Sequence, residues 1–343
     1  MVFRFMQSLF VEPAASIGKY DEALIQAAIE RVVDGTDPRL RAVGNYQRKL
    51  RDAVEYAVDY VDTLVDSLPS ALDVDTRRFT ADPRLRAFFV SADHVRETLG
   101  YSRSIRAHIQ KHPQPRPAVV YATLGMERIE KTVLGMELQG EVIKRDVPRV
   151  AVNFSGHRIV FPSHSEKAAR WELKKRAFDH LIETVLQRLV SIRARRQQLE
   201  RQLTLYQKKA KTFQAGNPGL QALLNPSSQE PTDWAGLEQQ MREIEAELIS
   251  IRTDFKTIEH YLAEIAKGLQ EAEQHLQVEH LSLNLDHMNY KATPGSKYPT
   301  NKLGLEEALL GNKRRLVIQL IRFPSDALPP PANLFETAGR YLF

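Results

Sequence analysis

The stretch FDHLIETVLQRLVSIRARRQQLERQLTLYQKKAKTF, residues 178–213, decides the fold of this chain. Apolar side chains recur in it at alternating steps of four and three residues, and Arg196 is the only charged member of the series. The same spacing returns over residues 237–276 without a polar break. Heptads sustained over this length are typical of a coiled coil.

The segment between the two heptad series predicts how they pair. Residues 215–234, AGNPGLQALLNPSSQEPTDW, are rich in Gly, Pro, Asn and Ser, which interrupt helices. The two helices should therefore fold back as an antiparallel hairpin, in a register where paired residue numbers sum to 450, such as 192 with 258. We expect a coiled-coil arm over residues 165–276, with its tip at 214–234. At about 1.5 Å per residue it would extend roughly 55 Å.

Charge supports pairing of the two arm helices with each other. Residues 165–213 contain 13 Lys/Arg and 5 Asp/Glu, whereas residues 229–276 contain 4 and 11. Opposite charges along neighbouring helices favour their association. In the same register Arg196 faces Asp254, which predicts an ion pair that sets the alignment.

A repeated hexapeptide organises the N-terminal part of the chain. DPRLRA occurs at 37–42 and 82–87, and the segments 37–56 and 82–101 share eight identities in 20 positions. Asp caps helices and Pro suits the first helical position, so two similar helix starts are one interpretation. The matches farther downstream favour the other, a diverged duplication with an offset of 45 residues. Ser91 begins a new helix in the second copy on either interpretation, and we expect a helical domain over 1–112.

Five acidic residues spaced three and four apart form a row along the helix of the first copy, and such a row could bind a metal ion. No Glu-x-x-His motif accompanies it, as a di-iron bundle would require. We therefore predict a solvated or arginine-paired face, with the second copy supplying the arginines. The row is Asp52, Glu55, Asp59, Asp62 and Asp66, and the candidate partners are Arg96, Arg103 and Arg106.

Short strand-like runs follow the proline-rich segment KHPQPRPA at 111–118. They lie at 118–124, 130–138, 280–288 and 315–323. The segment 149–162, RVAVNFSGHRIVFP, predicts a hairpin that turns at Ser155-Gly156 and places Val152 opposite Ile159.

These strand signals predict a mostly antiparallel β domain, split into residues 118–163 and 278–324 by the inserted arm. Residues 325–343 form a C-terminal tail in this interpretation. The predicted fold class is α+β, predominantly α.

Composition excludes several classes of function. The 343 residues include no cysteine, which excludes disulfides and thiolate chemistry and suits a cytoplasmic location. No apolar run is long enough to span a membrane. The phosphate-loop, dinucleotide, nucleophile-elbow and zinc-protease motifs are missing, so we predict no cofactor and no metal site.

The leading hypothesis is a non-catalytic scaffold or assembly protein that acts through protein–protein contacts and forms oligomers. Leucines at helical spacing mark the arm tip as its partner-binding site, which comprises Leu220, Leu223, Leu224 and Trp234. The first alternative is a nucleic-acid-associated accessory protein, which is not favoured, with the basic residues Arg193, Arg195, Lys313, Arg314 and Arg315. The third hypothesis is an enzyme whose active-site residues are dispersed in the helical domain.

Overall fold

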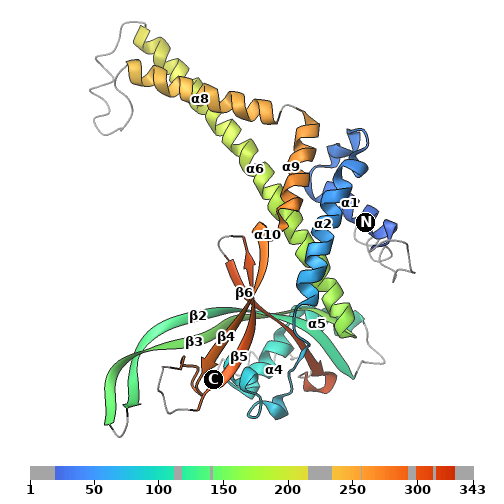
Figure 1. Ribbon diagram of the computed structural model, residues 1–343, viewed down its shortest axis with the longest axis vertical. Helices are drawn as coiled ribbons and strands as arrows, with labels where there is room; N and C mark the ends of the chain where they lie inside the picture. The colour runs from blue at the N-terminus through green and yellow to red at the C-terminus, as the bar shows by residue number, and fades with distance from the viewer. Residues whose placement is uncertain are drawn as a thin grey trace, which may run out of the picture. The chain divides into compact units, whose positions relative to one another are not determined.

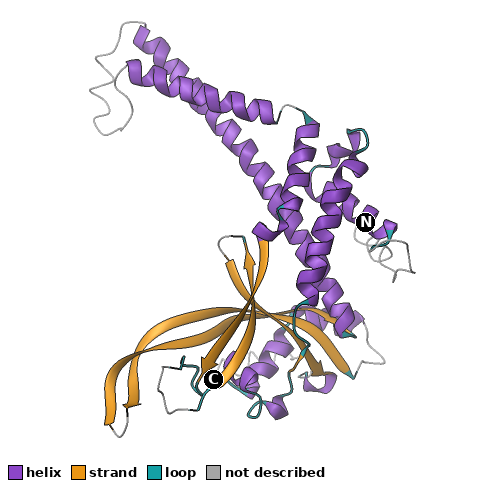
Figure 2. Ribbon diagram, in the orientation of Figure 1, coloured by secondary structure: helices purple, strands orange, loops and turns teal. Residues whose placement is uncertain are grey.

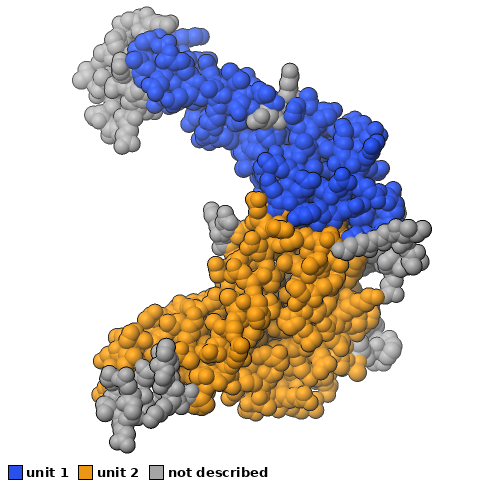
Figure 3. Space-filling view, viewed as in Figure 1, with its two compact units in different colours: residues 1–57, 179–271 blue, residues 58–178, 272–343 orange. Residues whose placement is uncertain are grey.

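The computed structural model describes residues 20–111, 118–139, 142–214, 234–255, 257–292, 299–311 and 314–328. It combines helices with an antiparallel sheet, in agreement with the α+β prediction (Figure 2). The chain divides into two compact units (Figure 3). Unit 1 comprises residues 1–57 and 179–271, and unit 2 comprises residues 58–178 and 272–343. This division cuts across the predicted helical domain 1–112, since residues 58–111 group with the sheet.

Unit 1 is built from helices (Figure 1). Its described elements are α1 (Glu22–Thr36), the 3-10 helix η2 (Pro38–Ala42), the first half of α2 (Tyr46–Asp66), most of α6 (Glu166–Gln214), α8 (Trp234–Asp254) and α9 (Ile258–Gln270). Two glycines allow neighbours to approach α6 closely. A Cβ at Gly268 of α9 would lie 2.7 Å from a methyl of Val185, and one at Gly35 of α1 would lie 2.6 Å from a methyl of Ile182. Glycine costs about 1 kcal/mol in a helix, which the close packing offsets here.

The second heptad segment is not one continuous helix. The chain leaves the α conformation after Asp254, and α9 starts at Ile258 with Thr257 and His260 forming a reciprocal cap. The last heptad position, Leu276, is the first residue of a strand. The prediction of an uninterrupted helix over 237–276 is therefore wrong, because apolar spacing carries no information about a capping residue.

The sheet of unit 2 has the strand order β3-β2-β6-β5-β4, with all neighbours antiparallel. Its strands are β2 (Val119–Gln139), β3 (Val142–Ser163), β4 (Leu276–Leu285), β5 (Asn301–Leu310) and β6 (Arg314–Pro324). The short strand β1 (Leu72–Asp73) pairs parallel with β6. Sequence analysis did not predict β5, because its LEEALL run consists of good helix formers. Its pairing with β4 and β6 overrides that preference.

The predicted hairpin at Ser155-Gly156 is wrong. β3 is continuous through this dipeptide and pairs with β2, so that Val152 lies opposite Glu130 and Ile159 lies opposite Leu124. The register shifts next to Gly156, whose φ of 64° marks a β-bulge instead of a turn. The strand candidates 118–124 and 130–138 likewise belong to the single strand β2.

Part of β2 and β3 extends beyond the sheet as a two-stranded ribbon (Figure 1). β2 pairs with β6 only from Val119 to Met126, and the rest of β2 pairs with β3 alone. Leu134 on this ribbon is 71% exposed. We call residues 127–139 and 142–155 the ribbon; at its base Val152 and Phe154 remain buried in the core, and Ala151 forms a β-bridge with Tyr290.

Three short helices pack against the sheet to form the core of unit 2. They are α3 (Pro83–Phe88), α4 (Ala92–Tyr101) and α5 (Arg103–Lys111). Phe88 contacts Phe154 of β3 edge to face, with ring centroids 5.1 Å apart. Phe323 of β6 and Leu124 of β2 are fully buried in the same cluster.

Both copies of DPRLRA begin a helix in the same way. The carboxylates of Asp37 and Asp82 accept hydrogen bonds from the backbone N–H groups of Arg39 and Arg84, and Pro occupies the first turn of each helix. The first copy continues as a 3-10 helix and the second as an α-helix. The predicted new start at Ser91 is confirmed, since its hydroxyl accepts a hydrogen bond at the start of α4.

The acidic row has an arginine partner in Arg51, which contacts Glu55 on the same helix at 2.8 Å, but two of its carboxylates pair with a lysine. Lys174 of α6 donates to Asp62 at 2.5 Å and to Asp66 at 2.8 Å. Arg96 of the second copy instead pairs with Asp93 on its own helix. A sequence repeat carries no information about which element folds against it, so only the tertiary structure identifies the lysine.

Candidate functional site

The basic and acidic helices of unit 1 pair through charged side chains. Arg195 of α6 donates two hydrogen bonds to Glu247 of α8, at 2.8 and 2.9 Å. Arg188 contacts Glu264 of α9 at 2.6 Å, and Arg252 contacts Glu200 at 3.3 Å. The helices α8 and α9 therefore run antiparallel to α6, and the predicted alignment with numbers that sum to 450 stays a prediction. We call α6 from residue 179 onward, together with α8 and α9, the arm.

Arg196 and Arg193, both on α6, contact different carboxylates. Arg196 contacts Glu200 on its own helix at 3.0 Å, and the side chain of its predicted partner Asp254 lies outside the described residues. Arg193 donates to Asp37 at 3.0 Å and lies over the ring of Tyr261, 4.8 Å from its centroid. Arg193 thereby ties the first DPRLRA copy to α6 and α9.

The described basic residues of the nucleic-acid hypothesis are divided between the two units. Arg193 and Arg195 belong to unit 1 and both have carboxylate partners. Arg314 and Arg315 belong to unit 2, where Arg315 contacts the buried Glu307 at 3.3 Å. Lys313 lies outside the described residues. Ion pairing of this kind reduces the positive charge that a phosphate backbone could contact.

The predicted partner site at the arm tip is mostly beyond what the structure describes. Leu220, Leu223 and Leu224 lie outside the described residues, whereas Trp234 is the first residue of α8 and is 40% exposed. Among the described residues, three other large apolar side chains along the arm are exposed, the first being Val190 of α6 at 52%. Leu205 of α6 is 48% exposed and Ile249 of α8 is 63% exposed.

Leu205 lies on α6 and Ile249 on α8. Sequence analysis missed them because the heptad rule selects the seam positions, and neither residue occupies one. Apolar residues outside the heptad series are the signal that could have identified them.

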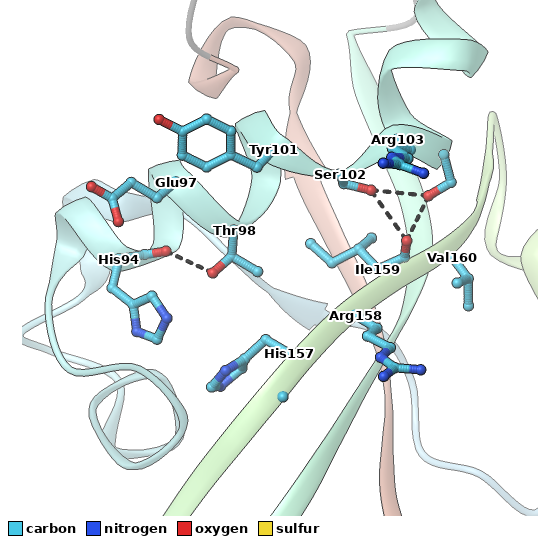
Figure 4. Close-up of a pocket in the computed structure, with 12 residues that line it drawn as sticks. His94, Glu97, Thr98, Tyr101, Ser102, Arg103, His157, Arg158, Ile159 and Val160 are labelled. Atoms are coloured by element: carbon cyan, nitrogen blue, oxygen red, sulfur yellow. Dashed lines mark hydrogen bonds between the residues drawn. The ribbon is translucent and has the colours of Figure 1, made fainter. Parts of the chain in front are cut away.

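A cavity of about 850 Å³ lies in unit 2 between α4, the start of α5 and β3 (Figure 4). Its histidines form a ring cluster with Phe89. The ring of His157 stacks on Phe89 with centroids 5.0 Å apart, and His94 meets His157 edge-on at the same distance. Burial of His157 lowers its pKa below the ordinary histidine value and favours the neutral ring.

The serine hydroxyl groups in this cavity are hydrogen-bonded to the backbone. Ser102 and Ser104 both donate to the carbonyl oxygen of Ile159, at 3.2 and 2.5 Å. The Nε2 atom of His157 lies 2.7 Å from the carbonyl oxygen of Phe88. Neither serine is thus aligned with a histidine as a nucleophile is with its base. Among the described side chains, no group of three or more His, Asp or Glu residues could hold a metal ion.

Comparison with protein-family models, curated proteins and solved structures finds no match to this chain. No helix within the described ranges is both long and apolar enough to cross a membrane. The inferences about function below therefore rest on sequence and geometry.

Proposed function

We propose that this protein is a non-catalytic assembly protein whose arm binds a second copy of the same chain. The supporting observation is the exposure of apolar side chains along the arm, among them Leu205 at 48% and Ile249 at 63%. The finer form of the proposal is that the arm is a coiled-coil hairpin. We further propose a cytoplasmic location, which the lack of cysteine in the sequence suits.

The charges of the arm favour self-association through apolar contacts. Ion pairs such as Arg195–Glu247 and Arg188–Glu264 neutralise charge within the chain. A second copy would then meet less electrostatic repulsion. Binding a second copy would remove such exposed apolar side chains from water, which favours association. A symmetric dimer would use the same surface twice, as most homodimers do.

The test is the mass of the full chain, measured by light scattering over a range of concentrations. We expect a dimer or larger oligomer that dissociates on dilution. The double substitution Leu205→Gln and Ile249→Gln should shift the protein toward the monomer while leaving helicity and melting temperature unchanged. The matched control Val90→Gln replaces an exposed apolar residue of unit 2 and should leave the mass unchanged. A monomeric wild-type chain at every concentration would refute the proposal.

A further inference from the structure

The histidine-lined cavity of unit 2 carries side chains for which the proposed assembly function has no use. Arg103, the first residue of α5, and Arg158 of β3 both line it and are exposed. Within the described part of the chain, neither guanidinium has a carboxylate or hydrogen-bond partner. By contrast, Arg84 pairs with Asp82 in the same unit. The cavity therefore has two cationic groups available to a ligand.

These two arginines occupy one side of the cavity. Figure 4 places Arg103 and Arg158 on the side opposite His94 and Glu97. An anionic group would be attracted to the arginine side and repelled from Glu97. Guanidinium groups bind phosphate through paired N–H donors, so a phosphate fits this side well.

Hydrogen bonds assign the tautomers of the two histidines. A carbonyl oxygen can only accept, so His157 donates from Nε2 to Phe88 and its Nδ1 is an unprotonated acceptor in the neutral ring. The backbone N–H of Val90 donates to Nδ1 of His94 at 3.3 Å, so the neutral His94 carries its proton on Nε2. His157 thus offers a hydrogen-bond acceptor and His94 a donor. Both line the cavity together with the exposed ring of Tyr101.

We propose that this cavity binds a compound that contains both a planar nitrogen-containing ring and a phosphate group. The phosphate lies at Arg103 and Arg158, and the ring lies beside His94, His157 and Tyr101. The cavity volume of about 850 Å³ falls within the usual range for small-molecule sites. A nucleoside monophosphate combines the required phosphate, planar ring, and hydrogen-bond donors and acceptors.

The test is calorimetric titration of the full chain with adenosine monophosphate, adenosine and inorganic phosphate as separate probes. We expect adenosine monophosphate to bind more tightly than either fragment. Arg103→Gln and Arg158→Gln should each weaken its binding about tenfold, the usual effect of losing a charged hydrogen bond. The matched control Arg86→Gln removes an exposed arginine of α3 that does not line the cavity, and it should bind like the wild type.

Three outcomes would overturn the proposal. The first is no binding of adenosine monophosphate at millimolar concentration. The second is equal affinity for adenosine monophosphate and inorganic phosphate, which would mean that the ring contributes nothing. The third is unchanged affinity in both arginine variants when their melting temperatures match the wild type. The light-scattering test of assembly is independent of all three.

Discussion

At the scale of the residue, Asp37 joins η2 to α6 through one carboxylate that is 9% exposed. It caps η2, binds the side chain of Arg39 at 2.7 Å and accepts from Arg193 of α6 at 3.0 Å. The hydrogen bonds from Arg39 are the main cause that lowers the pKa of Asp37 from 3.8 to about 2, with a smaller effect from Arg193. A carboxyl that is a stronger acid when folded stabilises the protein above its unfolded pKa.

Asp37→Asn should therefore reduce the free energy of unfolding at neutral pH by about 2 kcal/mol, from the size of the pKa difference. The stability that Asp37 contributes is lost as pH falls from about 4 toward 2, so variant and wild type should converge there. Denaturant unfolding at a series of pH values measures this. The control Asp34→Asn removes an exposed carboxylate and should change stability much less. A difference that persists unchanged at pH 2 would contradict the assignment.

At the scale of the element, the ribbon depends on a buried charge cluster where it leaves the sheet. The Glu307 side chain is 2% exposed and accepts two hydrogen bonds from Arg128, both at 3.1 Å. Arg128 also contacts Glu130, which binds Lys291 at 2.6 Å. A two-stranded ribbon is marginally stable in water, so these contacts contribute much of its order.

Glu307→Ala should lower the free energy of unfolding by about 3 kcal/mol, because it leaves Arg128 without its buried carboxylate. Amide hydrogen exchange should increase most in residues 127–136. Glu238→Ala removes an exposed carboxylate of α8 and serves as the control. Unchanged exchange in the ribbon would show that the cluster does not hold it.

The arm register can be tested at the same scale by crosslinking. Ile192 lines a cavity of about 300 Å³ together with Phe255 and Tyr261, near the start of α9. Since the chain has no cysteine, introducing Cys at 192 and 258 gives an unambiguous pair. A short bismaleimide should join them within one chain. Cys at 192 and 241 is the control and should give no intrachain product, because the two positions lie far apart in the register. Products formed only between chains would contradict the hairpin.

At the scale of the whole molecule, the local sequence pattern determined where several helices begin and which segments form most of the strands. The tertiary structure determined which of these elements contact each other. Heptad spacing predicted the helix over 178–213, and the Asp-Pro and Ser caps predicted the starts at 38, 83 and 92. These features depend on neighbours within a few residues, so the sequence alone determines them. Short strand-like runs likewise identified segments of β2, β3, β4 and β6, but not which strand pairs with which.

Only the tertiary structure decided the features that depend on distant partners. It made Gly156 a bulge within a long strand, turned the helix-forming LEEALL run into β5, and placed Lys174 against the acidic row. It also brought His94, Arg103 and Arg158 to one cavity. Each outcome depends on contacts between residues far apart in the chain, whose energies exceed local preferences and leave no periodic trace in the sequence.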